Sequence, residues 1–472
     1  MFRMCRSKII LLIGVALCTP AMAGQAEPRQ AEAQTREFQS ALAHYNSGQY
    51  LEAVRELESL REQNPASFEV HELLGLAYSA AGKDHPANLN FEKAVQLRPE
   101  SALARANLAV NLAHLGRKDR AEAEFKKAIQ LEPDSFEANH DLGEFYARDD
   151  KVIAAIPYLK KAQMIDPSSY ANGYDLALAY SETNDLNLAR GQIRALLAQQ
   201  DTAELHNLLG EIEERAGNFV PAANELQRAA EMDPSESNIF DWGSELLIHR
   251  TLEPAAEVFS RGLERYPNSP RLAVGLGLAL YQRGRYDEAV KAFLHATDLT
   301  PTDSRAYYFL SQAYDSSPNQ ADAVIQRFRR YAEFEPKNAR AQFYYAMAMW
   351  KGKETEVSGA DLEQIRQMLQ RALALDPSLT EAHLQLGKLY SRERKYAEAI
   401  PEYERALKLD PNLADAHYRL GQAYTHLGDT NRAQREFQIH QQLYQQQLAE
   451  DDKRKEEILQ FVYSVKGTQP KP

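Results

Sequence analysis

Apolar residues recur along this chain at spacings of three and four, in stretches that are separated by short polar turns. Leu74 and Tyr78 follow this spacing in one stretch, and Ala87, Phe91 and Ala94 follow it in the next. Spacings of three and four place side chains on one face of an α-helix. The pattern therefore predicts a chain of amphipathic helices.

The helical stretches belong to a longer repeat, which is marked by proline. Pro65, Pro99, Pro133 and Pro167 are each 34 residues apart. After a gap, Pro234, Pro267, Pro301 and Pro336 follow at intervals of 33, 34 and 35 residues, and Pro377 and Pro411 close the series, 34 residues apart. Self-similarity at such a period predicts an array of small stacked units rather than one large core.

Each unit reads as two helices joined by a tight turn. The unit that begins at Phe68 contains Leu74-Gly75, Tyr78, Gly82, Ala87, Phe91, Ala94 and Pro99. Units that begin at Ala102, Pro270, Thr380 and Ala414 carry the same kinds of residue at the same positions. Gly82 suits a left-handed helix end, and the proline ends the second helix. Such a unit cannot bury its apolar face alone, so stacking completes the core.

This pattern resembles the tetratricopeptide repeat (TPR), and the resemblance covers Gln34 to Tyr444. It implies an all-α, right-handed superhelical solenoid of about twelve TPR helix–turn–helix units. We place the array at residues 34–447. The unit from Ala339 carries extra residues near 351–360, which predict a longer turn.

The first 23 residues have the three parts of a secretory signal peptide. Arg3, Arg6 and Lys8 precede the apolar run 9–18, and a small-x-small site ends at Ala23. This run is shorter than the roughly 20 residues that span a bilayer. An uncleaved anchor and a lipoprotein modified at Cys18 are the alternatives. Leu17 departs from the small residue that usually precedes a lipidated cysteine.

Polar or charged segments border the array. We expect 24–33 to be a flexible linker, 448–464 a C-terminal capping helix and 465–472 a disordered tail. The alternative for the C-terminal helix is binding to a partner or self-association.

The net charge argues against two classes of partner. The whole chain carries a formal charge of −12, and removal of three cations with residues 1–23 leaves 52 basic against 67 acidic residues, or −15. Such a surface disfavours nucleic acid and anionic lipid as general partners. Both cysteines, Cys5 and Cys18, lie in the signal segment, so the mature chain has none.

The catalytic and metal-binding motifs in the sequence are incomplete. His71-Glu72 begins like a zinc-protease helix, but Gly75 stands where the second histidine is required. We interpret His71 as an ordinary surface residue of a helix. His383 and His417 are one period apart, and a paired metal site there is weighed against two solvated side chains. We expect no enzyme activity, no cofactor and no metal.

The resemblance implies that the first helix of each unit lines a concave face, which is the usual binding surface of the family. Arg271, Arg305 and Arg340 occupy the same position in three successive units. We call them the arginine ladder. Aromatic residues of the same first helices complete the predicted ligand-binding set: Tyr281, Tyr308, Phe343 and Trp350.

Arginine and exposed aromatics favour an acidic or carboxylate-bearing peptide, or an anionic glycan, as the ligand of the ladder. The alternative is that the arginines pair with nearby acids while the aromatics pack between units. An acidic stretch falls on earlier first helices: Glu137, Glu144, Glu204, Glu211 and Glu214. The lysine–asparagine set with which several TPR proteins hold a peptide C-terminus is not found here.

These features predict a non-enzymatic scaffold for protein–protein interaction in the bacterial cell envelope, periplasmic or secreted. A protein or peptide would bind on the concave face. The alternative is an accessory subunit of exopolysaccharide synthesis or export that contacts glycan or the synthase. Salt separates the two, because binding to arginines weakens as ionic strength rises.

Overall fold

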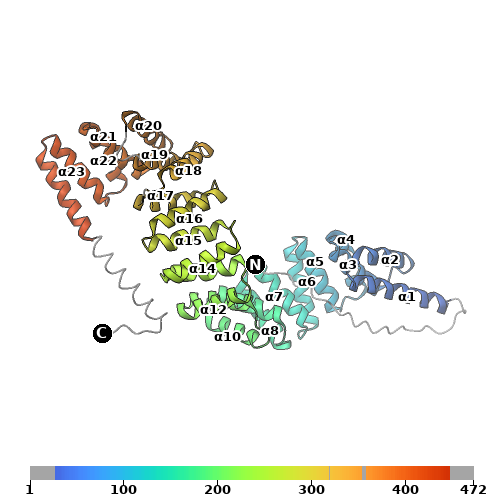
Figure 1. Ribbon diagram of the computed structural model, residues 1–472. Coiled ribbons are helices and arrows are strands. Elements are labelled where there is room, and N and C mark those ends of the chain that lie inside the picture. Colours follow the sequence, from blue (N-terminus) through green and yellow to red (C-terminus); the bar gives the residue numbers. More distant parts are fainter. Residues whose placement is uncertain (1–26, 318, 353–357, 447–472) are drawn as a thin grey trace, which may run out of the picture. The chain divides into compact units, whose positions relative to one another are not determined.

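The computed structural model describes residues 27–446 apart from 318 and 353–357, and all the regular secondary structure among these residues is helical (Figure 1). The chain divides into two compact parts, an N-terminal part of residues 1–216 and a C-terminal part of residues 217–472. The segments predicted as signal peptide, capping helix and disordered tail lie outside the described residues.

The helices of the N-terminal part are α1 (Glu27–Asn46), α2 (Tyr50–Gln63), α3 (Phe68–Ala80), α4 (Asp84–Leu97), α5 (Ala102–His114), α6 (Lys118–Leu131), α7 (Phe136–Arg148), α8 (Val152–Ile165), α9 (Tyr170–Glu182), α10 (Leu186–Leu197) and α11 (Ala203–Arg215).

The helices of the C-terminal part are α12 (Phe219–Met232), α13 (Glu236–Ile248), α14 (Leu252–Arg265), α15 (Pro270–Gln282), α16 (Tyr286–Leu299), α17 (Ser304–Ser316), α18 (Ala321–Phe334), α19 (Ala339–Gly352), α20 (Gly359–Leu375), α21 (Thr380–Arg392), α22 (Tyr396–Leu409) and α23 (Ala414–His426). Residues 430–446 form one more helix within the described range.

Within each part, a helix packs mainly against the next helix in the chain, as Figure 1 shows for α14, α15 and α16. Odd-numbered helices also contact one another, for example α3 with α5 and α13 with α15. This is the packing of stacked helix–turn–helix units, each of which completes its neighbour's core. The prediction of an all-α solenoid of about twelve such repeats is confirmed.

The Leu-Gly pair of the repeat marks the closest approach of its two helices. A Cβ added to Gly75 would lie 2.6 Å from the ring of Phe91 on the next helix. Phe91 is almost fully buried. The same contact recurs between Gly143 and Leu159, Gly277 and Phe293, Gly387 and Tyr403, and Gly421 and Phe437. A side chain at these positions would occupy the space that the large residue fills.

The turn between the paired helices has a left-handed backbone. Gly82 and Gly116 have φ of 74° and 71°, as the sequence predicts. Four repeats place other residues there, namely Asp150, Asn184, Arg250 and Arg394, at φ between 57° and 64°. The left-handed backbone of the turn is therefore kept even where the residue has a Cβ atom, which makes this conformation less favourable than it is for glycine.

In several repeats, a polar side chain hydrogen-bonds the carbonyl oxygen of the proline that ends the preceding repeat. His71 Nε2 lies 3.1 Å from the carbonyl oxygen of Pro65, six residues earlier, and its Nδ1 lies 2.9 Å from Asn90 Oδ1. The same position bonds the proline carbonyl in four other repeats: Arg105 with Pro99, Asn139 with Pro133, His383 with Pro377, and His417 with Pro411.

The interpretation of His71 as an ordinary surface residue was therefore wrong. Only 6% of the residue is exposed. A buried polar group needs hydrogen-bond partners, and here they are the carbonyl of Pro65 and Asn90.

Two predicted boundaries can be compared with the helices. α1 begins at Glu27, inside the segment 24–33 that was assigned to a flexible linker. α19 ends at Gly352 and α20 begins at Gly359. The extra residues of that repeat thus fall between its two helices, and 353–357 lie outside the described residues.

We expect Gly75→Leu to destabilise the protein by about 1–3 kcal/mol, because overpacking displaces the Phe91 ring. Gly191→Ala is the matched control: it lies within α10 and a Cβ there would meet nothing within 4 Å. The control should be neutral or stabilising, since alanine favours a helix over glycine. Thermal unfolding followed by circular dichroism measures both. Equal melting temperatures for Gly75→Leu and wild type would contradict the close-packed role.

Candidate functional site

The first member of the arginine ladder is held by groups of the preceding repeat. Arg271 Nε lies 3.0 Å from Glu236 Oε1, and its guanidinium carbon lies 5.0 Å from the centre of the Phe240 ring. Ser269 Oγ donates to the same Glu236 oxygen. These donors lower the pKa of Glu236, the Ser269 hydrogen bond most, followed by Arg271.

The other two arginines of the ladder also have acidic partners. Arg305 bonds both oxygens of Asp303 at 3.0 and 2.9 Å, and Asp303 itself caps the N-terminus of α17. Arg340 NH1 lies 3.7 Å from Glu381 Oε1, and its side chain hydrogen-bonds Tyr344. The three guanidinium groups thus each face an acid of this chain.

The four predicted aromatic residues have different surroundings. Tyr281 and Phe343 are half-buried and pack against the core of the C-terminal part. Tyr308 is 44% exposed and meets Phe309 edge to face. Trp350 lines a sizeable cavity.

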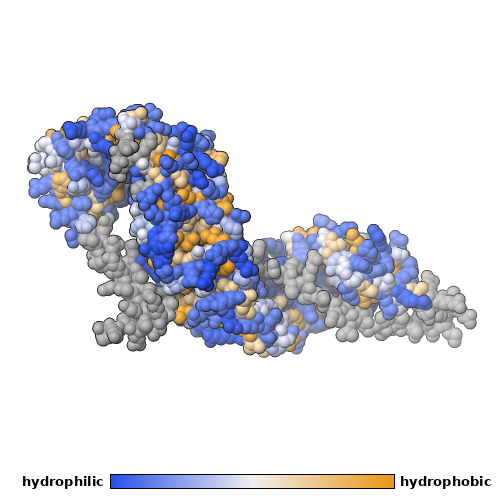
Figure 2. Space-filling view, viewed as in Figure 1, coloured by the Kyte–Doolittle hydropathy of each residue, from blue (hydrophilic) through white to orange (hydrophobic). Residues whose placement is uncertain are grey.

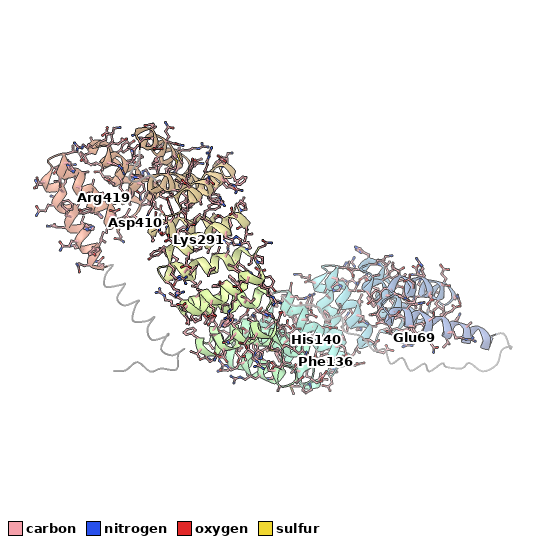
Figure 3. All side chains as sticks on the ribbon, in the orientation of Figure 1. Glu69, Phe136, His140, Lys291, Asp410 and Arg419 are labelled. Carbon is pink, nitrogen blue, oxygen red and sulfur yellow. The ribbon has the colours of Figure 1, made fainter. Side chains whose placement is uncertain are left out.

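This cavity, which we call the C-terminal groove, has a volume of about 590 Å³. Its lining comes from α17, α19, α21, α22 and α23, so it lies mainly on the first helices of the last four repeats. The polar and aromatic lining residues are Asp315, Trp350, Lys351, Gln385, Lys388, Ser391, Arg392, Tyr396, Tyr403, Arg419, Gln422 and His426. Figure 3 labels Arg419 on α23.

Cations of the groove bridge successive repeats. Lys388 Nζ on α21 lies 2.5 Å from Asp415 Oδ2 on α23, and Arg419 Nε lies 3.2 Å from Asp415 Oδ1. Burial alone would raise the pKa of Asp415, but Lys388 and Arg419 hold it below its usual range. Lys351 on α19 similarly reaches Asp315 on α17, with 3.6 Å between Nζ and Oδ1.

The groove therefore combines a positive charge excess with flat rings. Four cationic side chains line it, namely Lys351, Lys388, Arg392 and Arg419, whereas Asp315 is its one acidic lining residue. The Tyr396 and His426 rings stack at 4.2 Å between centres. Cations beside rings suit carboxylate groups carried on an extended chain.

Sequence reasoning missed most of this groove. Lys388 is the ninth residue of its repeat, and Lys351 and Arg392 are the thirteenth of theirs, counted from Ala339 and Thr380. Both positions belong to the first helix of the repeat, whereas the arginine ladder lies at the second position. The signal in the sequence is the positive charge at the ninth and thirteenth positions of these two neighbouring repeats.

The predicted acidic stretch of the N-terminal part includes Glu144, which neighbours two further carboxyls. Burial, followed by the charges of Glu144 and Glu137, raises the pKa of Asp141 to about 7. Asp175 on α9 is 8% exposed, and burial with the Glu144 charge raises its pKa to about 7 as well. These carboxyls lie near one another on α7 and α9.

His383 and His417 do not share a metal site, because other groups occupy both rings. His383 Nδ1 lies 2.7 Å from Glu402 Oε2, and His417 Nδ1 lies 2.6 Å from Glu436 Oε2. The second nitrogen of each ring bonds a proline carbonyl, as described above. The expectation of solvated side chains was also wrong, since the two residues are 7% and 8% exposed.

Comparison with known families agrees with the repeat pattern. A tetratricopeptide-repeat family model matches residues 38–89, 87–136, 115–170, 174–237, 240–304 and 284–339. Two further models of the repeat match residues 395–428 and 415–444. The chain therefore belongs to the tetratricopeptide-repeat family. Such repeats make it a scaffold for protein–protein interaction.

Relatives of known name share only part of this array. The TPR repeat-containing protein YpiA of Bacillus subtilis is 28% identical over 152 residues, which are 31% of this chain and 33% of that protein. Superkiller protein 3 of Schizosaccharomyces pombe is 24% identical over 195 residues, or 40% of this chain and 14% of that protein. The chain thus spans a third or less of these relatives.

Two solved structures align with the chain at low sequence identity. Pseudomonas aeruginosa pilF is 19% identical, with a TM-score of 0.39 over 44% of this chain and 96% of that one. The Cut9–Hcn1 hetero-tetramer of the APC/C is 15% identical, with a TM-score of 0.38 over 88% of this chain and 95% of that one.

In the described residues, every helix is too short or too polar to cross a membrane.

The raised carboxyl pKa values predict a pH-dependent stability. An unfolded aspartate titrates near 3.8 and folded Asp175 near 7. Between these values the folded chain holds the extra proton, so stability falls as pH rises from about 4 to 7. Asp175→Asn should therefore raise the free energy of unfolding at pH 8 by more than ~1 kcal/mol, which is seen as a higher melting temperature. Near pH 4 the substitution should change the melting temperature little.

The control for this prediction is Asp134→Asn, because the Asp134 side chain is 83% exposed. The thermal unfolding of the wild type and of both variants is measured with a metal chelator present, so that trace metal bound by these carboxyls does not affect the comparison. A wild-type melting temperature that is as high at pH 8 as at pH 5, together with no gain in Asp175→Asn, would contradict the prediction.

Proposed function

We propose that this protein is a non-enzymatic scaffold that binds an acidic segment of a partner protein in its C-terminal groove. The observation that carries the proposal is the gathering of Lys351, Lys388, Arg392 and Arg419 in one cavity of a chain whose net charge is −12. A positive surface on an acidic protein is the kind of complementarity that directs a negatively charged partner to one place.

The groove's own contacts indicate how such a segment is recognised. Asp415 lies between Lys388 and Arg419, so a carboxylate already occupies the position that the cations favour. Carboxylates of a partner would bind beside it, on the cations that face the cavity. Trp350 and the stacked Tyr396–His426 pair supply flat apolar surface for the segment's side chains.

We place the scaffold in the bacterial cell envelope, on the support of the N-terminal sequence. The cationic start, the apolar run 9–18 and the small residues before Gly24 are the parts of a cleaved export signal. Fractionation of cells and mass determination of the purified protein test this location. A mature N-terminus at Gly24 in the periplasmic or secreted fraction is the expected result, and an intact Met1 in the cytoplasm is the opposing one.

The test of the groove compares two triple variants with the same charge change. The groove variant is Lys351→Gln, Lys388→Gln and Arg392→Gln. The ladder variant, Arg271→Gln, Arg305→Gln and Arg340→Gln, removes as many charges from positions on first helices that do not line the cavity. The probe is a fluorescent polyglutamate peptide, and binding is followed by anisotropy as salt is raised from about 0.05 to 0.5 M.

We expect the groove variant to lose about tenfold in affinity or more, which is ~1.4 kcal/mol, and the ladder variant to stay close to wild type. Wild-type binding should weaken with salt. Loss only in the ladder variant would move the site to the arginine ladder. Absence of binding to the peptide, with salt-resistant binding of anionic exopolysaccharide that requires Trp350, would favour the glycan-contacting alternative instead.

A further inference from the structure

A histidine and carboxylates gather on the first helices of two successive repeats, α7 and α9, in the N-terminal part. One ring nitrogen of His140, one oxygen of Asp141 and one oxygen of Glu144 all lie within 4.8 Å of one another. Figure 3 labels His140 on α7, one turn from Phe136, and their rings stack at 5.5 Å between centres. The stacked ring limits the orientation of the imidazole.

The hydrogen bonds around His140 fix which of its nitrogens has a lone pair. Asn172 Nδ2 donates to the carbonyl oxygen of Leu159 at 2.9 Å and to Gln163 Oε1 at 2.8 Å. The Asn172 amide oxygen therefore faces His140 and lies 3.2 Å from Nδ1. Nδ1 must carry the proton, so Nε2 of the neutral ring keeps its lone pair. Among the described residues, no group hydrogen-bonds Nε2.

This arrangement differs from that of three other buried histidines, His71, His383 and His417. In His71, His383 and His417 both ring nitrogens face oxygen atoms of this chain. His140 has one such contact, and that contact is typical of a metal-binding histidine, whose second nitrogen donates to an oxygen that orients the ring.

The carboxylates beside His140 have hydrogen-bonding capacity that the described residues leave unused. Glu144 Oε1 is buried and accepts no hydrogen bond, although its charge is paired with Arg148 at 3.3 Å. Asp175 is more than nine-tenths buried and accepts none from the described residues. It lies three residues beyond Asn172 on α9, so it shares the face that contacts His140.

The charges of this cluster do not cancel. Among the described residues, three carboxylates, Asp141, Glu144 and Asp175, lie beside one cation, Arg148, when all are ionised. Crowded like charges in a partly buried place are costly unless a counter-charge binds. A divalent ion has the charge that would neutralise the difference.

We propose that His140, Asp141 and Glu144 bind a divalent transition-metal ion, with Asp175 of the next repeat supplying negative charge beside it. A donor set of one imidazole and carboxylates suits Zn²⁺ or Mn²⁺ better than Ca²⁺ or Mg²⁺, which prefer oxygen alone. The ion would be bound by α7, and its charge would attract the Asp175 carboxylate of α9 in the next repeat.

The experiment titrates ZnCl₂ and MnCl₂ separately into the untagged, chelator-treated mature protein by isothermal calorimetry. We expect one ion per chain and a loss of about tenfold or more in affinity for Asp141→Asn and for Glu144→Gln. The absorption spectrum of bound Co²⁺ gives a second readout of a nitrogen–oxygen ligand set. His140→Gln should alter that spectrum.

His383→Gln is the matched control, because His383 is equally buried on a first helix but has both nitrogens engaged. It should bind the metals as wild type does. No binding of Zn²⁺ or Mn²⁺ up to millimolar concentration would overturn the proposal. So would binding that Asp141→Asn and Glu144→Gln leave unchanged, or that His383→Gln weakens as much as they do. Circular dichroism confirms that each variant is folded.

Discussion

The close approach of two helices at a residue without a side chain is the contact on which this architecture depends. At Gly75, the ring of Phe91 occupies the space that a Cβ atom would need. Because the contact recurs through the array, each repeat presents nearly the same outer surface to the next. Stacking then follows from the geometry of a single repeat, and first helices come to lie beside first helices.

That regular stacking is also what assembles the charged surfaces. Residues that are one period apart in the sequence become neighbours in space, so a lysine of α21 can reach an aspartate of α23. The C-terminal groove and the carboxylates on α7 and α9 both arise in this way. The groove has an excess of cations, whereas the cluster around Glu144 has an excess of carboxylates. The two surfaces therefore suit ligands of opposite charge.

Much of the fold could be predicted from the sequence because residues of the same type recur at fixed positions of each repeat. The helices, the left-handed turn at Gly82 and the tight packing at Gly75 all follow from residues at fixed positions. The partners of polar side chains could not be predicted in the same way. His71 and Arg305 occupy expected positions, yet their roles depend on a proline carbonyl and on the capping residue Asp303, respectively. Such contacts involve atoms that the repeat pattern does not specify.

The bond to the proline carbonyl has a consequence for how such an array can grow. Pro65 ends one repeat, His71 lies on the first helix of the next, and the acceptor is a main-chain carbonyl. A duplicated or transplanted repeat that carries the polar side chain therefore needs no matching side chain in the repeat before it. Length can thus change by whole repeats without a redesign of the connection, while the charges on the inner face vary independently from one repeat to the next.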